Sequence, residues 1–177
     1  MQDRILMLGS KFGTFNEVAQ ENLGPASACL SPGADPNSPS FQNKGDKSKP
    51  NEDSLLVLRQ GTSWLLAVSD GHFGTSTAEA VIEHLSRIPK IPQRLGPLSL
   101  WLSSLQLPNS ASMAGATLTV ACFEEQTRKV MGLSLGDSSI ATISEAGFEL
   151  RNQPNENYIR PTSGVAIELA CKFDFTL

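Results

Sequence analysis

Carboxylates and an imidazole flank two stretches of the sequence that are typical of β-strands. Asn51-Glu52-Asp53 precedes the first stretch, and Asp70-Gly71-His72 follows the second. Carboxylate and carbonyl oxygens are the donors that hard cations such as Mg²⁺ and Mn²⁺ prefer, and Gly71 lets the backbone turn so that its carbonyl can face a metal. Asp-Gly is also a common turn dipeptide. The prediction of a metal site therefore depends on whether the two stretches come together.

The stretches from Asp53 to Arg59 and from Trp64 to Asp70 predict an antiparallel hairpin around a turn that contains Gly61. If Arg59 lies opposite Trp64, the same register places Asp53 opposite Asp70, so that the two carboxylates meet. Alternate residues of a strand point to opposite faces, and here both faces are apolar. We therefore expect a sheet that is covered on both sides.

The rest of the chain predicts an α+β protein. Ser76-Thr-Ala-Glu79 resembles a capping box that opens a helix ending before Pro89, and a shorter helix is expected over 98–105. Strand pairs are expected at 116–123 with 130–135 and at 140–143 with 148–150. This grouping favours antiparallel sheets with segregated helices.

The N-terminal part differs in character. A helix is predicted from Phe12 to Leu23, followed by a Pro- and Ser-rich arm from Gly24 to Pro50. We expect residues 1–43 to form this helix and arm, and residues 44–177 to form the main domain.

The composition excludes several classes of function. Lys and Arg total 14 against 18 Asp and Glu, for a net charge of −4, which argues against a nucleic-acid partner. No apolar stretch approaches the length of a membrane span, so we expect a cytoplasmic protein with no membrane partner. The three cysteines, Cys29, Cys122 and Cys171, form no CxxC pair, so neither a disulfide framework nor a thiolate zinc site is expected, and we predict that they are small buried apolar side chains.

Four ordered motifs resemble those of the metal-dependent protein serine/threonine phosphatases of the 2C type. They are Asn51-Glu-Asp53, Val68-Ser-Asp-Gly-His-Phe-Gly74, Gly115-Ala-Thr-Leu118 and Leu135-Gly-Asp-Ser-Ser139. The resemblance spans roughly residues 44–150. It implies a four-layer α-β-β-α sandwich of antiparallel sheets flanked by helices, of which this chain would hold a part.

The resemblance also implies roles for individual residues. Asp70 would bridge two Mg²⁺ or Mn²⁺ ions, Gly71 would supply a carbonyl ligand, Glu52 would hold the second ion's water shell, and Asp53 would support it. His72 would be the general acid, or else a turn histidine bonded to the backbone. Asp137 matches a position near an additional metal and is equally explained as a turn aspartate. His84 is expected on the surface.

The sequence departs from the family pattern in three places. Where the family has a phosphate-binding arginine, this chain has Ser48, flanked by Lys47 and Lys49 as candidate phosphate-binding residues. A lysine lacks the guanidinium fork and orients phosphate less well. The family's Gly-Asp-Ser-Arg becomes Gly136-Asp-Ser-Ser139. Two further metal-binding aspartates, in Asp-Gly and Asp-Asn contexts, have no match after Leu150.

Two functions follow from these observations. The first is a signalling hydrolase: a Mg²⁺- or Mn²⁺-dependent protein phosphatase that hydrolyses phosphoserine and phosphothreonine through a metal-activated water. We expect a monomer that takes a phosphoprotein substrate. We also expect a truncated form of the fold, with unrelated or frame-altered sequence after about Leu150, and little or no activity for this chain. The alternative is a non-catalytic pseudophosphatase or phosphoprotein-binding regulatory module.

Overall fold

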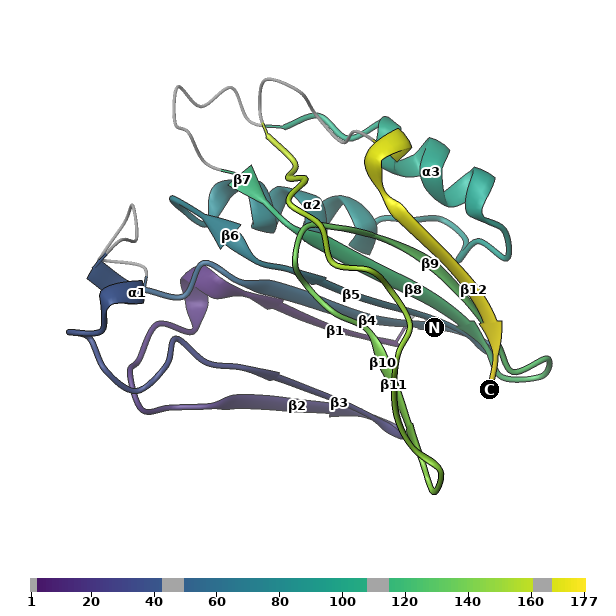
Figure 1. Cartoon of the computed structure of the whole chain (residues 1–177), viewed down its shortest axis with the longest axis horizontal. Helices are drawn as coiled ribbons and strands as arrows, with labels where there is room; N and C mark the ends of the chain where they lie inside the picture. The colour runs from purple at the N-terminus through teal and green to yellow at the C-terminus, as the bar shows by residue number, and fades with distance from the viewer. Residues whose placement is uncertain (1–2, 43–49, 108–114, 161–166) are drawn as a thin grey trace.

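The central element of the computed structural model is a six-stranded antiparallel sheet with the strand order β1-β4-β5-β8-β9-β12 (Figure 1). The structure describes residues 3–42, 50–107, 115–160 and 167–177, so Lys47 and Lys49 lie outside the described residues. The strands of the sheet are β1 (Asp3–Leu8), β4 (Ser54–Gln60), β5 (Ser63–Ser69), β8 (Leu118–Glu124), β9 (Lys129–Leu135) and β12 (Cys171–Thr176).

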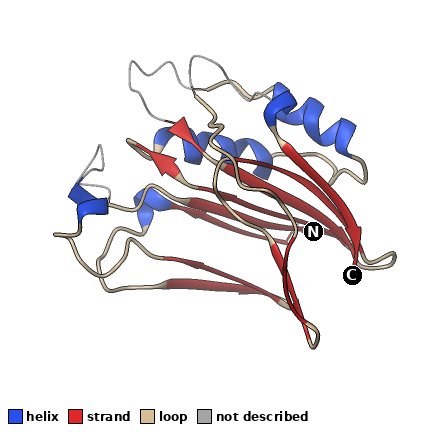
Figure 2. Ribbon diagram, viewed as in Figure 1, coloured by secondary structure: helices blue, strands red, loops and turns tan. Residues whose placement is uncertain are grey.

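Two helices, α2 (Ser76–Ser86) and α3 (Leu95–Ser103), cover one face of this sheet (Figure 2). Every second side chain of β4 and β5 faces them, because side chains alternate between the two faces of a strand. Leu58 and Leu65 are fully buried there against Val81, Ile82 and other apolar residues of α2. Each such side chain stabilises the fold by about 1.5–3 kcal/mol.

His84 lies between the two helices. Its ring stacks on that of Trp101 with 4.9 Å between the ring centroids, and its Nε2 is 2.8 Å from the Trp101 carbonyl oxygen. The Trp101 indole N–H in turn donates to the His84 carbonyl oxygen at 3.3 Å. The expectation of a surface histidine is therefore wrong, because this side chain is partly buried and joins α2 to α3.

Two separate hairpins lie on the other face of the sheet. The first, β2 (Ala19–Leu23) with β3 (Ala26–Leu30), packs on the edge formed by β1 and β4. The second hairpin consists of β10 (Ala141–Ser144) and β11 (Gly147–Leu150). Arg151 directly follows β11, and its guanidinium lies over the ring of Phe175 in β12. Between the two hairpins, Leu66 and Val68 of β5 are 39% and 43% exposed.

This arrangement confirms the prediction of an α+β protein. The described residues comprise a helical layer, a large antiparallel sheet and the two hairpins (Figure 1), which agrees with part of the expected sandwich. The strand pairs expected at 116–123 with 130–135 and at 140–143 with 148–150 are also present, as β8 with β9 and β10 with β11.

The helix predicted from Phe12 to Leu23 is wrong. Its apolar stripe was too narrow to bury a helix, and Val18, one of its members, is 66% exposed. The backbone turns at Asn16, whose φ is +62°, and then enters β2. Part of the expected arm is also ordered, as β3 and the short helix α1 (Pro39–Gln42).

Helix α2 begins where the sequence predicts but without a capping box. The structure shows no side-chain hydrogen bond at its N-cap residue, Thr75. Glu79 instead accepts a hydrogen bond from the backbone N–H of Ser10 at 3.0 Å. Ser10 belongs to the 3-10 turn η1 (Gly9–Lys11) after β1, so Glu79 ties the end of β1 to α2.

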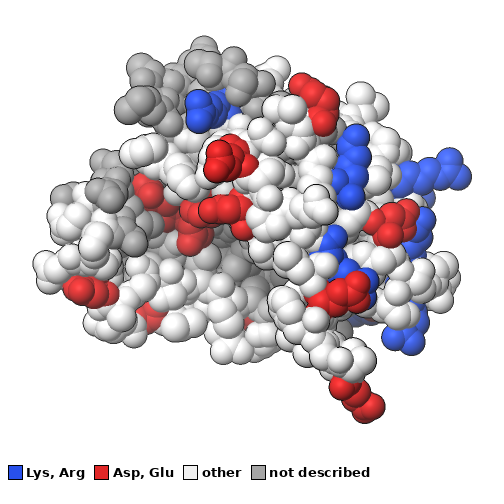
Figure 3. Space-filling view, in the orientation of Figure 1, with Lys and Arg blue, Asp and Glu red and all other residues white. Residues whose placement is uncertain are grey.

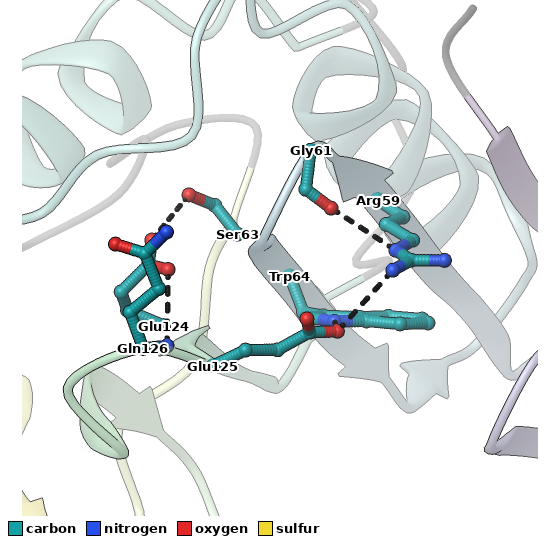
Figure 4. Close-up of polar contacts among 7 residues, drawn as sticks. All are labelled: Arg59, Gly61, Ser63, Trp64, Glu124, Glu125 and Gln126. Carbon is teal, nitrogen blue, oxygen red and sulfur yellow. Dashed lines mark hydrogen bonds and ion pairs between the residues drawn. The ribbon is translucent and has the colours of Figure 1, made fainter.

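The register of the β4–β5 hairpin is the one that the sequence predicts. Arg59 pairs with Trp64 and Ser54 with Ser69. A polar cluster holds the turn end of the hairpin (Figure 4): the Trp64 indole N–H donates to Glu125 at 2.6 Å, and the Arg59 guanidinium lies 5.0 Å from the centroid of the Trp64 ring. The hydroxyl of Ser63 donates to Glu124 at 2.7 Å and is the main reason that the pKa of Glu124 lies below its ordinary value.

Described residues after Leu150 are integrated into the fold, although they match no motif of the family pattern. Residues 152–159, which we call the strap, run from the turn after β9, where Asn155 contacts Gly136, to Ala116, which forms a bridge with Ile159, and β12 later pairs with β9. None of the helices in the described ranges is long and apolar enough to span a lipid bilayer.

Candidate active site

Asp53 and Asp70 lie at the same end of the β4–β5 hairpin. Each is the neighbour of a residue in the last strand pair, Ser54 with Ser69, so the register brings the two aspartates to one end of the sheet. Both line a cavity of about 260 Å³, together with Ser138 and Cys29. The expectation of buried cysteines holds for Cys122 and is wrong for Cys29, which is exposed on β3. The meeting of these two segments, which the sequence predicts, is therefore present in the structure.

The backbone of Asn51, Glu52 and Asp53 is enclosed by two glycines. A Cβ atom at Gly9 would lie 2.3 Å from the Asp53 carbonyl oxygen, and one at Gly71 would lie 2.4 Å from the Glu52 carbonyl oxygen. Neither position has room for a side chain. Glu52 itself is buried, with 3% of its surface exposed. Asn51 is fully buried, and its amide donates to the Phe12 carbonyl oxygen at 3.1 Å.

Thr117 holds Asp70 in place and was missed as a site residue from the sequence. Its Oγ1 accepts the backbone N–H of Asp70 at 3.0 Å, and its own N–H donates to the Asp70 carbonyl oxygen at 2.9 Å. Its carbonyl oxygen accepts the Ser69 hydroxyl at 2.6 Å, and its Oγ1 is 2.8 Å from Ser138 Oγ. Thr117 lies within the Gly115-Ala-Thr-Leu118 motif, which was the available signal.

His72 follows Asp70 in a short strand. Gly71 and His72 form β6 (Gly71–His72), which pairs with β7 (Gly115–Ala116). The Nδ1 atom of His72 is buried and has no hydrogen-bond partner among the described residues. Its ring lies edge-on to that of Tyr158, with 4.8 Å between the centroids and 62° between the planes.

The strap brings Tyr158 to the site. At its start the buried Asn152 accepts the backbone N–H of Ile140 at 2.8 Å, and in its middle Asn155 exchanges hydrogen bonds with Gly136. These contacts fix the turn that carries Asp137, whose side chain is exposed. No residue of the strap was predicted to be part of the site, because the sequence does not show which backbone groups its asparagines bind.

Negative charge gathers around this end of the sheet. Figure 3 shows acidic side chains beside a hollow, with most of the visible basic side chains on the other side of the view. Partial burial, and after it the negative charges of Asp137, Asp70 and Glu156, raises the pKa of Tyr158. A local excess of carboxylates attracts cations.

The donors at this end fit a hydrated divalent cation. Asp53 and Asp70 offer carboxylate oxygens to one cavity. In the described ranges no three His, Cys, Asp or Glu side chains come close enough to enclose a metal ion. Mg²⁺ usually keeps several water molecules and takes only one or two protein carboxylates. Asp53 and Asp70 are therefore the pair of carboxylates that this cavity offers to such a cation.

Comparison with known proteins identifies the fold. No protein-family model matches the sequence, and no curated protein matches it. Among solved structures, a bacterial serine phosphatase carrying an arginine-to-alanine mutation is similar, with a TM-score of 0.57 and 19% sequence identity. The match covers 72% of this chain and 64% of that chain, so this chain spans less than two thirds of the phosphatase structure. The chain thus has an α+β fold similar to that of a serine phosphatase.

Proposed function

We propose that this protein is a divalent-metal-dependent phosphatase that acts on phosphoserine and phosphothreonine in proteins. One observation carries the proposal: Asp53 and Asp70, from the ends of two paired strands, line the same cavity. The similarity of the fold to that of a bacterial serine phosphatase supports the same reaction class.

The chain's own residues divide the work of binding the metal. Asp70 and Asp53 hold a hydrated Mg²⁺ or Mn²⁺, the Gly71 carbonyl is a further donor, and Glu52 orders the water shell. Asp137, on the neighbouring turn, is the candidate for an additional ion. A bound cation supplies an activated water molecule and offsets the charge of the phosphoryl oxygens. Thr117 keeps the Asp70 backbone fixed through two hydrogen bonds.

His72 is the group that protonates the leaving oxygen of serine or threonine. An alkoxide is a poor leaving group, so a positioned acid accelerates its departure, typically by 10²–10⁴-fold. His72 is two residues from Asp70 in the chain, and Tyr158 lies close enough to contact its ring and to be affected by the Asp70 charge.

The expected turnover is slow. Two cations ordinarily share the activation of water and the neutralisation of the phosphoryl group, and the described residues enclose no complete metal centre. A missing metal costs several kcal/mol of transition-state stabilisation, or about a thousandfold in rate.

The same observation favours a second candidate function, a non-catalytic module that binds phosphoproteins. A site with two carboxylates can hold one hydrated cation, and that cation can attract a phosphate group without hydrolysing the ester. This candidate predicts binding of a phosphothreonine peptide that is retained after long incubation, with no release of phosphate.

The test is phosphate release from a radiolabelled phosphothreonine peptide by the full chain, with Mn²⁺ and with a chelator. We expect slow release that requires Mn²⁺ and falls at least about tenfold in Asp70→Asn, the loss expected when a metal-holding carboxylate is removed. Asp174→Asn is the matched control, because Asp174 of β12 pairs with Lys129 of β9 at 2.9 Å and does not line the cavity. Equal release by both variants would refute the proposed site, and bound but intact peptide would favour the binding module.

A further inference from the structure

The backbone alone does not determine the orientation of the His72 ring. β6 ends at His72, and the next two residues leave the strand direction, with φ of +63° at Phe73 and +134° at Gly74. The buried Nδ1 of His72 has no hydrogen-bond partner among the described residues. Among the described residues, no hydrogen bond at Nδ1 therefore fixes the ring, and packing contacts have to be considered.

Tyr158 supplies that packing. Its ring meets the His72 ring edge-on at 4.8 Å between centroids and 62° between planes. Aromatic pairs favour such edge-to-face arrangements at centroid distances of about 4.5–7 Å. The contact therefore has a geometry that restricts the rotation of the smaller ring.

Tyr158 can restrict His72 because its own backbone is fixed to the same short strands. The neighbouring residue Ile159 is fully buried and exchanges two backbone hydrogen bonds with Ala116, at 2.9 and 2.8 Å. Ala116 in turn pairs with Gly71. Three chain segments thus form one small sheet, and the two aromatic rings project from its outer members.

The strap is also held upstream of Tyr158. The N–H of Asn155 donates to the Gly136 carbonyl oxygen at 2.8 Å, the Gly136 N–H donates to Asn155 Oδ1 at 3.1 Å, and the Asn157 N–H donates to the same oxygen at 2.9 Å. Tyr158 therefore lies between two anchored points, Asn155 and Ile159, and its ring has little freedom to leave His72.

We propose that Tyr158 is a positioning residue, which holds the His72 imidazole edge-on in the orientation that delivers its proton to the leaving oxygen. This inference rests on the proposed function, because it assigns to a second residue the alignment of the proposed acid. Alignment of a reacting group contributes to rate because misplacement by about 1 Å can cost about a hundredfold. The role requires the ring of Tyr158 and not its hydroxyl group.

The test compares two substrates that differ in their need for an acid. A phosphothreonine peptide has an alkoxide leaving group, whereas p-nitrophenyl phosphate has one that departs without protonation. We expect Tyr158→Leu to lower turnover of the peptide about tenfold and that of p-nitrophenyl phosphate less than about twofold, as expected for the loss of acid catalysis alone. Tyr158→Phe should retain both rates. Phe148→Leu, in the exposed β10–β11 hairpin, is the control.

His72→Ala should show the same substrate pattern, and adding Tyr158→Leu to it should cause no further loss, because residues that act as a unit are not additive. Equal loss on both substrates in Tyr158→Leu would indicate a merely structural role and overturn the proposal. Loss of peptide turnover in Tyr158→Phe as large as in Tyr158→Leu would overturn it as well.

A spectroscopic readout separates this proposal from the proposed function. The two histidines can be assigned in proton–carbon NMR spectra by comparison with His72→Ala and His84→Ala. The ring protons of His72 should show a ring-current shift that persists in Tyr158→Phe and disappears in Tyr158→Leu. An unchanged His72 signal in Tyr158→Leu overturns the positioning contact, even if the enzyme is active. If the shifts are as expected but the protein shows no metal-dependent turnover, the contact between the rings is confirmed and the proposed function is refuted. The contact then has no catalytic role.

Discussion

Asp70 and Thr117 are joined by two hydrogen bonds, from the Asp70 N–H to Thr117 Oγ1 at 3.0 Å and from the Thr117 N–H to the Asp70 carbonyl oxygen at 2.9 Å. Only the first of them uses the threonine side chain. Thr117 is fully buried, so removal of its hydroxyl leaves the Asp70 N–H without its acceptor. A buried donor that loses its partner costs about 1–3 kcal/mol.

Thr117→Val should therefore lower the free energy of unfolding by about 2 kcal/mol, and Thr117→Ser by less, since serine keeps the hydroxyl and loses one methyl group. Urea unfolding of the two variants measures the difference. The hydroxyl has no special role if the serine variant is as unstable as the valine variant.

Gly71→Ala should lower the free energy of unfolding by about 1–3 kcal/mol, because the added Cβ would lie 2.4 Å from the Glu52 carbonyl oxygen. Gly96→Ala is the matched control. Gly96 lies in the first turn of α3, where an added Cβ meets no atom within 4 Å beyond the adjacent residues and the helix backbone, so alanine should cost much less there than at Gly71. Similar midpoints of urea unfolding for the two variants would contradict the close approach at Gly71.

The buried thiol of Cys122 makes stability depend on pH. Burial in β8 raises the pKa of Cys122 from 9.0 to about 12. The folded-state pKa lies above the unfolded value, so this contribution to stability is complete below about pH 9 and is lost as the pH rises toward 12. Between pH 9 and 11 the free energy of unfolding should fall by up to about 1.4 kcal/mol per pH unit more in the wild type than in Cys122→Ala. Parallel pH profiles of the two proteins would rule out this contribution.

Much of the site's framework could be predicted from local pattern. The β4–β5 hairpin consists of two apolar stretches joined by a short glycine-containing turn, and the turn sets the register that brings Asp53 and Asp70 together. The α2 helix has regular apolar spacing, which predicts its position but not the partner of Glu79, since the contact of that side chain with Ser10 joins distant segments.

The rest of the fold depends on long-range partners. β12 is an edge strand that becomes recognisable only through its pairing with β9. β2 pairs with β3 in a stretch whose sequence predicted a helix followed by an arm. The strap is the clearest case. Asn152 and Asn155 act through backbone groups of a turn far away in the chain, and the contact of Tyr158 with His72 requires that turn to be in place.

Binding of Mn²⁺ to the full chain tests the central claim most directly, and electron paramagnetic resonance of the free ion measures it even when binding is weak. We expect weak binding by the wild type, because the cavity offers two carboxylates and the remaining ligands are water. Asp70→Asn should abolish this binding, and Asp174→Asn, which removes an exposed carboxylate that does not line the cavity, should leave it unchanged. Unchanged Mn²⁺ binding in Asp70→Asn would contradict the account and remove Asp70 from the site.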